Sequence, residues 1–260
     1  MQTTIDLPAV GTVEFTAVEF TADEFTSAEP DAGRPYLLLH GGGGVATMAG
    51  FAGLLAGRAR SRVLLPTHPG FAGTPRPAGL ASVTGLAEAY AGLLDRLDLT
   101  GVTVVGNSFG GWLAAEIGLL GSPRVTGLML IDAVGAVVDG HPVPDVATLT
   151  PAELAAHAWH DPARAPRPPA AGGNGPSPDV LALLAYTGPA MADPTLLDRL
   201  RGLDLPVHIV WGASDRIVDT AHARAYADAV AGSRLTILPG SGHLPQLETP
   251  EELLRALLEE

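Results

Sequence analysis

Cysteine is absent from this sequence, which excludes disulfides, thiolate nucleophiles and metal sites with cysteine ligands. Basic side chains are scarce, with 15 arginines and no lysine against 28 aspartates and glutamates, and the formal net charge at pH 7 is −13. Negative charge of that size repels phosphate groups, so neither nucleic acid nor an anionic membrane is an expected partner. The simplest interpretation of the charge is an acidic, well-hydrated surface.

Long apolar runs are missing as well. No stretch of about 18 apolar residues occurs, so no transmembrane helix is expected. The first residues, Met1 to Asp6, lack the basic and then apolar pattern of a secretory signal, which makes the cytoplasm the expected location. The 260 residues, 47% of them hydrophobic, suffice for one large α/β domain with a substantial core.

Short apolar segments typical of buried strands alternate with segments of helical periodicity. The strand segments are 36–39, 62–65, 102–105, 125–131, 206–211 and 235–238, and the helical segments are 46–58, 82–97, 112–120, 220–231 and 250–258. Apolar strands separated by helices predict an α/β fold with a mostly parallel central sheet and helices on both faces. Residues 9–29 repeat a pattern close to Val-Glu-Phe-Thr-Ala and predict an additional hairpin at the edge of the sheet.

The alternation stops between residues 133 and 202. Proline and alanine become frequent there, short helices are predicted at 151–160, 178–186 and 194–201, and a glycine-rich loop spans 171–176. We expect residues 133–202 to form a helical cap, inserted into a core domain made of residues 1–132 and 203–260. In parallel α/β sheets, ligands bind at the carboxyl ends of the strands, so the cap is expected to lie there.

A Gly-x-Ser-x-Gly pentapeptide, residues 106–110, lies between a predicted strand and a predicted helix. That context is typical of a nucleophile elbow, in which a tight turn lifts the serine Oγ out of the sheet. The backbone N–H of Phe109 would then point toward a developing oxyanion at the start of the helix. The alternative interpretation is a glycine-rich turn in which Ser108 merely caps the helix.

A serine nucleophile needs a neighbouring base, and the base needs an orienting acid. In elbow folds the acid and then the histidine follow the serine, and the chain supplies Asp215 and His243 in that order, each after a predicted strand. Asp132, at the end of the strand 125–131, is the alternative acid. The second oxyanion donor is expected from the glycines that follow His40, most directly from Gly42.

Further residues of these loops are expected near the substrate. The expected substrate contacts are Gly41, Gly43, His68, Phe71 and Trp159. Packing within the loop is the alternative for His68, and His40 is expected to brace the oxyanion loop. The histidines and carboxylates lack a zinc-type spacing such as His-Glu-x-x-His, and the glycines lack a nucleotide-binding pattern, so no metal and no cofactor are expected.

Taken together, these motifs resemble the α/β-hydrolase superfamily. The matching pieces are His40-Gly41-Gly42-Gly43, residues 69–74, residues 106–111, residues 212–215, and Gly242-His243 with Glu248 and Pro250. The elbow and the polyglycine segment are similar to the branch of meta-cleavage-product C–C hydrolases and related esterases. Leu244 stands where that branch usually has a Trp, and Arg164, Arg167 and Arg199 are the candidates for its substrate-binding Arg.

The resemblance implies a cofactor-free serine hydrolase that cleaves an ester or lactone of a small-to-medium, mostly apolar molecule through an acyl-enzyme. C–C bond hydrolysis is the first alternative. A binding role without turnover, and a biosynthetic acyltransferase or cyclase, are further alternatives, and a homodimer stays open. Epoxide hydrolases and haloalkane dehalogenases of this fold use an aspartate nucleophile, so Ser108 argues against both activities.

Overall fold

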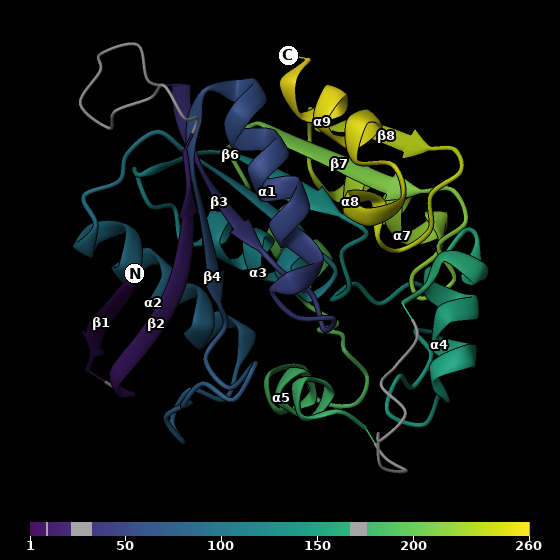
Figure 1. The fold of residues 1–260 in the computed structure, drawn as a ribbon, viewed down its shortest axis with the longest axis horizontal. Coiled ribbons are helices and arrows are strands. Elements are labelled where there is room, and N and C mark those ends of the chain that lie inside the picture. Colours follow the sequence, from purple (N-terminus) through teal and green to yellow (C-terminus); the bar gives the residue numbers. More distant parts are fainter. Residues whose placement is uncertain (9, 22–32, 167–175, 260) are drawn as a thin grey trace.

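An eight-stranded sheet forms the centre of the computed structural model, which describes residues 1–8, 10–21, 33–166 and 176–259 (Figure 1). The strands lie in the order β1-β2-β4-β3-β5-β6-β7-β8. Their bounds are β1 (Gln2–Leu7), β2 (Gly11–Phe20), β3 (Gly33–Leu39), β4 (Ser61–Thr67), β5 (Val102–Asn107), β6 (Val125–Ile131), β7 (Val207–Gly212) and β8 (Arg234–Leu238). The strands β4, β3, β5, β6, β7 and β8 run parallel to one another. The strands β1 and β2 are antiparallel additions at one edge.

Helices cover both faces of this sheet. They are α1 (Ala46–Ala59), α2 (Val83–Arg96), α3 (Phe109–Leu119), α4 (Pro151–Ala158), the 3₁₀ turn η1 (Pro162–Arg164), α5 (Pro178–Thr187), α6 (Leu196–Leu200), α7 (Thr220–Ala229), α8 (Pro245–Glu248) and α9 (Pro250–Leu258). Successive strand side chains point to opposite faces, so Val104 packs into the cluster with α2, α3 and α7, and Val105 into the cluster with α1 and α9. The predicted α/β fold class is confirmed. Within the described ranges, no helix is both long enough and apolar enough to span a membrane.

The N-terminal hairpin uses other residues than expected. The repeat at 9–29 contributes β2, but the partner strand is β1, with Gln2 opposite Thr16 and Leu7 opposite Gly11. The five-residue repeat contains a two-residue alternation that buries Val13, Phe15 and Ala17, because only every second side chain of a strand faces the core. The last part of the repeat lies outside the described residues.

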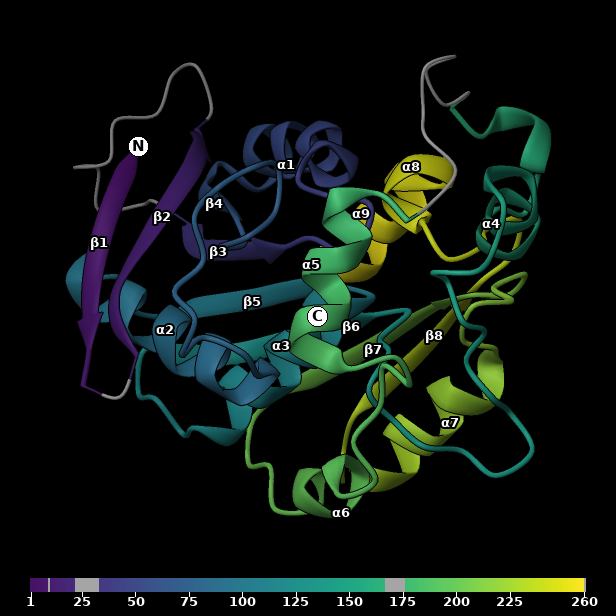
Figure 2. The ribbon, with the colours of Figure 1, turned by 90° about the horizontal axis from the view of Figure 1, so that it is seen from below.

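The segment 133–202 separates into two parts by its packing. Figure 1 shows α4 and α5 at the lower side of the molecule, away from the helices that cover the sheet faces, and Figure 2 looks onto this side. Leu196 and Leu200 of α6, like Leu183 and Tyr186 of α5, are buried in the main core, whereas Ala158 of α4 packs in a separate small cluster. The helix α6 also packs against α3 and α7. The described helices of the expected cap that lie away from the sheet faces are α4 and α5.

Candidate active site

Ser108 occupies a strained turn between β5 and α3. Its backbone has φ 58° and ψ −117°, a region that residues with side chains rarely adopt. The flanking glycines are required by close approach: a Cβ on Gly106 would overlap the carbonyl of Gly110, and a Cβ on Gly110 would overlap the carbonyl of Leu39. The helix α3 begins at Phe109, three residues earlier than expected, so Ser108 stands directly at its N-terminus. This is the geometry of a nucleophile elbow.

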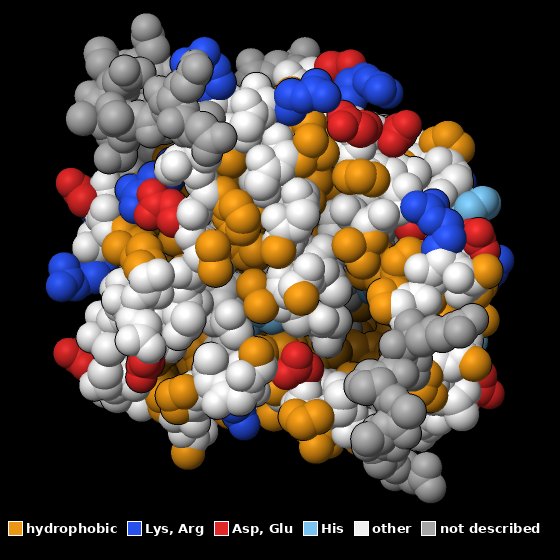
Figure 3. Space-filling model, in the orientation of Figure 1, with side chains coloured by type: hydrophobic (Ala, Val, Ile, Leu, Met, Phe, Trp, Pro, Cys, Tyr) orange, Lys and Arg blue, Asp and Glu red, His pale blue; other side chains and the backbone are white. Residues whose placement is uncertain are grey.

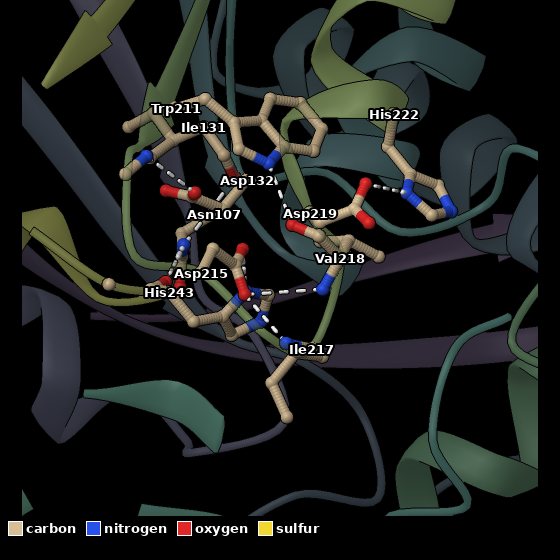
Figure 4. A network of polar contacts seen from close by, with 12 residues as sticks. Asn107, Ile131, Asp132, Trp211, Asp215, Ile217, Val218, Asp219, His222 and His243 are labelled. Atoms are coloured by element: carbon tan, nitrogen blue, oxygen red, sulfur yellow. Dashed lines mark hydrogen bonds and ion pairs between the residues drawn. The ribbon is translucent and has the colours of Figure 1, made fainter. Parts of the chain in front are cut away.

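His243 and Asp215 form a buried pair beside this turn (Figure 4). The Nδ1 of His243 donates to Asp215 Oδ2 over 2.7 Å, and Asp215 Oδ1 accepts the backbone N–H groups of Ile217 and Val218 at 2.8 and 3.1 Å. With Nδ1 engaged, the Nε2 of His243 is the ring nitrogen available to act as a base. Ser108 and His243 line the same cavity, so the structure brings the three expected residues together.

The glycine loop after β3 lies against the other side of Ser108. A Cβ on Gly41 would come within 2.9 Å of the Cβ of Ser108, and a Cβ on Gly42 would come within 2.9 Å of Leu183 on α5. The N–H of Phe109 is in the first turn of α3, where helices leave backbone donors without an intrahelical acceptor. The loop and the helix N-terminus can therefore present two backbone donors to one oxygen, as expected for Gly42 and Phe109.

Two histidines brace this loop from behind. Both are fully buried: His40 Nδ1 donates to the Gly41 carbonyl at 2.8 Å, and His40 Nε2 accepts the backbone N–H of His68 at 3.2 Å. His68 Nε2 donates to the His40 carbonyl at 2.9 Å, and His68 Nδ1 accepts from the Tyr90 hydroxyl at 2.6 Å. Burial lowers the pKa of His40 to about 4 and the pKa of His68 well below its usual value. Both rings are therefore neutral braces, and His68 does not reach the cavity.

Two aromatic residues expected to contact substrate pack behind the cavity wall as well. Phe71 is fully buried and stacks on Phe109, with ring centroids 6.1 Å apart. Trp159 is buried against Ile217. Neither Phe71 nor Trp159 lines the cavity, whereas Gly41 and Gly43 do. These large apolar rings lie in the core because burial there removes more of their apolar surface from water than a position on the cavity wall would.

The cavity above Ser108 has a volume of about 270 Å³ and a largely apolar wall. Its apolar lining is Val134, Val146, Leu154, Ala158, Val180, Leu183, Met191, Ile217 and Leu244. Figure 3 shows a hollow with hydrophobic side chains between the positions of α4 and α5 in Figure 1. Besides His243, the one ionisable side chain in the described part of the lining is Asp179 of α5, whose Oδ1 accepts the Ala72 N–H at 2.8 Å.

The three arginine candidates do not supply a cation to this lining. Arg164 is exposed on η1. Arg199 binds Glu116 through two hydrogen bonds of 2.7 Å and Asp193 through one of 2.6 Å, in a cluster that holds α6 against α3. Arg167 lies outside the described residues. The described wall of the cavity therefore carries one carboxylate and no guanidinium.

Two residues that sequence reasoning gave no role hold the His243 loop in place. Asn107 donates from Nδ2 to the backbone carbonyl of His243 at 2.9 Å, and its Oδ1 accepts from Gln246 at 3.0 Å. Glu248 accepts the backbone N–H groups of Gly242 at 2.7 Å and of His160 at 3.0 Å. The sequence signals were that Asn107 is the first of the two variable positions of the elbow and that Glu248 follows His243 by five positions.

Asp132, the alternative acid, lies at the end of β6 close to this pair. It is fully buried with φ 45°, and its Oδ1 accepts the backbone N–H of Gly212 at 2.8 Å. Burial first, and then the neighbouring charge of Asp215, raise the pKa of the Asp132 carboxyl well above its usual value. The Nδ1–H of His243 donates to Asp215 and not to Asp132, so the geometry favours Asp215 as the orienting acid.

Known proteins resemble this chain in sequence and in fold. An uncharacterized protein of Mycobacterium tuberculosis is 29% identical over 253 residues, which cover 86% of this chain and 74% of the relative. A 2-hydroxy-6-oxo-2,4-heptadienoate hydrolase of Pseudomonas putida is 40% identical over 107 residues, 40% of this chain and 39% of the relative. The crystal structure of a meta-cleavage product hydrolase, CumD, superposes with a TM-score of 0.74 at 22% identity and covers 99% of this chain and 96% of that one.

The model of the alpha/beta hydrolase family matches residues 36–256, which include the elbow, the glycine loop and the Asp215–His243 pair. Because the match spans most of the chain and the fold agrees with it, this protein belongs to the α/β hydrolase family of enzymes.

Proposed function

We propose that this protein is a serine esterase that hydrolyses small, mostly apolar, uncharged esters or lactones. The observation that carries the proposal is the Asp215–His243 pair beside Ser108, in a cavity that also presents the N-terminus of α3 and the glycine loop. Those groups are a nucleophile, its base, an orienting acid and two oxyanion donors.

In the proposed reaction, Ser108 Oγ attacks the ester carbonyl while His243 Nε2 takes the hydroxyl proton. The negative charge that develops on the carbonyl oxygen is stabilised by the N–H groups of Gly42 and Phe109. His243 then returns the proton to the departing alkoxide, which leaves an acyl group on Ser108. A water molecule, deprotonated by His243, attacks the acyl-enzyme, and His243 then gives this proton to Ser108 Oγ as the acid leaves. Asp215 stabilises the charged imidazole in both halves of the reaction.

The cavity supports a small substrate without negative charge. At about 270 Å³ it lies near the lower end of the range for small-molecule pockets. A substrate carboxylate buried against the described part of this wall would find no arginine as a partner and would face Asp179 instead. Burying an unpaired charge is strongly unfavourable, so a neutral ester fits better than an anion.

C–C bond hydrolysis is the second candidate, because one relative named for that chemistry is 40% identical over 107 residues and a structure named for it shares the fold. The name 2-hydroxy-6-oxo-2,4-heptadienoate specifies a substrate with a carboxylate. The absence of a guanidinium from the described wall disfavours such a substrate in this protein, and this difference ranks ester hydrolysis first.

Hydrolysis of p-nitrophenyl esters from acetate to octanoate tests the proposal. We expect the highest kcat/KM at short acyl chains, and a loss of at least about 10⁴-fold in Ser108→Ala, because the nucleophile of such a triad cannot be replaced. The matched control is Ser122→Ala, because Ser122 precedes β6 and does not line the cavity. A folded wild type that is inert on all esters but cleaves 2-hydroxy-6-oxo-2,4-heptadienoate would reverse the ranking.

A further inference from the structure

The structure holds a second carboxyl group against the Asp215–His243 pair. Asp132, Asp215 and His243 each place a polar side-chain atom within 4.8 Å of the other two, and all three residues are buried (Figure 4). One oxygen of Asp132 accepts the N–H of Gly212, whereas the other, Oδ2, is buried and has no hydrogen-bond partner. An ionised Asp132 would thus leave a buried charged oxygen unsatisfied, which is strongly unfavourable.

The groups that face this pair offer no compensating cation. They are His243 from the loop after β8, Glu248 from α8 and His222 from α7, and burial lowers the pKa of His222. Among the described residues, no arginine or lysine forms an ion pair with Asp132 or Asp215. Two adjacent buried carboxylates without a cation cannot both stay ionised, so one of them holds a proton.

The hydrogen bonds decide which carboxyl is charged. Asp215 accepts three donors, namely the N–H groups of Ile217 and Val218 and the Nδ1–H of His243. Asp132 accepts a single donor, the N–H of Gly212. Hydrogen bonds to a carboxylate favour its ionised form, which assigns the charge to Asp215 and the proton to Asp132.

We propose that Asp132 holds a proton in the resting enzyme and donates a hydrogen bond from Oδ2 to the carboxylate of Asp215, so that the two side chains share one negative charge and act on His243 as a single acid pair. Asp132 is thereby a positioning residue: it occupies a free lone pair of Asp215 and keeps that carboxylate turned toward His243. The direction of the Asp132 pKa, raised by burial and by Asp215, agrees with this assignment.

Infrared spectroscopy tests the proton directly and does not depend on any substrate. The carbonyl stretch of a protonated carboxyl group is separate from the bands of carboxylates. We expect this band in the wild type at pH 7 and at pH 8, its loss in Asp132→Asn, and its retention in the control Asp219→Asn. Asparagine suits the positive φ of this position and keeps both the acceptor for Gly212 and a donor for Asp215. Absence of the band from the wild type at both pH values overturns the proposal, whether or not the variant folds.

A kinetic comparison tests the role of the pair, and this part rests on the proposed esterase activity. We expect Asp132→Asn to keep kcat within about threefold, because a neutral donor is replaced by a neutral donor. Asp215→Asn should lose up to about 10⁴-fold. The double variant should lose a further tenfold or more, because Asp132 is then the remaining carboxyl that can ionise behind His243. A loss in Asp132→Asn as large as in Asp215→Asn would overturn the proposal, since it would require a charged Asp132.

Discussion

The backbone N–H of His243 donates to the carbonyl oxygen of Ala158 over 2.7 Å, which ties the base of the proposed triad to the cap. The backbone N–H of Arg216, next to Asp215, likewise donates to the carbonyl of His157 at 3.0 Å. The end of α4 therefore belongs to the frame that positions the acid and the histidine. The other cap helix, α5, reaches the core through Asp179 and through the Tyr186 hydroxyl, which donates to the Pro69 carbonyl at 2.9 Å.

Glu248→Gln is expected to loosen this frame. A glutamine has a single acceptor oxygen. With that oxygen in the place of Oε2, which accepts the N–H of Gly242, its NH₂ group would point at the backbone N–H groups of residues 160 and 161, which Oε1 of Glu248 accepts at 3.0 and 3.3 Å. We expect a loss of about 1–3 kcal/mol in the free energy of unfolding, measured in urea, and a lower kcat from a displaced His243. The control is Glu251→Gln, at an exposed position of α9. Unchanged stability and kcat would show that the loop is held by other contacts.

Gly42→Ala is expected to lower kcat by about 10-fold or more, because one oxyanion-hole donor contributes roughly 10²–10³ in rate. The added Cβ would come within 2.9 Å of Leu183 and push the glycine loop away from Ser108. Combining Gly42→Ala with Leu183→Ala makes room for the methyl group and should restore part of the rate. Steady-state kinetics of both variants on one ester decides the matter, and a double variant no faster than Gly42→Ala would contradict a steric cause.

Asp132→Asn is expected to change how stability depends on pH. Burial raises the native pKa of Asp132 above its usual value of 3.8, so the native state keeps a proton that the unfolded chain releases. The contribution of the Asp132 proton to the free energy of unfolding is fully present below about pH 4. It is lost at about 1.4 kcal/mol per pH unit as the pH rises toward the native pKa. Asparagine does not titrate, so the free energy of unfolding of the variant, measured in urea, should rise relative to that of the wild type between pH 5 and pH 8. If the stabilities of the variant and the wild type changed with pH in parallel, Asp132 would be ionised in the native state.

Asp179→Asn is expected to change the preference for substrate charge. Asparagine keeps the oxygen that accepts the Ala72 N–H and removes the negative charge from the cavity wall. With p-nitrophenyl hexanoate and mono-p-nitrophenyl adipate as a matched pair, we expect a severalfold gain in kcat/KM for the adipate alone, the size of one partly screened charge interaction. An equal change for both esters would mean that Asp179 acts on the shape of the cavity rather than on charge.

Much of the proposed site could be predicted from local sequence. The glycines around Ser108 are needed because any Cβ there would overlap the backbone of the same turn or of β3, and this constraint is visible as Gly-x-Ser-x-Gly between a strand and a helix. The positions of Asp215 and His243 follow from the strand order, since each begins a loop at the carboxyl end of a parallel strand. Substrate contacts could not be predicted in this way. His68 and Phe71 lie in a loop over the site, but the rotation of a loop depends on what packs behind it.

The sequence by itself determined the type and order of the elements, the α/β class and the serine and histidine of the proposed triad, because these depend on periodicity, steric demands within a turn and chain order. Only the tertiary structure decided that Asp215 rather than Asp132 bonds to His243, that Asn107 and Glu248 hold the histidine loop, and that the described cavity wall carries Asp179 without a guanidinium. These contacts join segments far apart in the chain, 136 residues apart for Asn107 and His243. Their distances are set by how the whole sheet and cap pack, which no local pattern encodes.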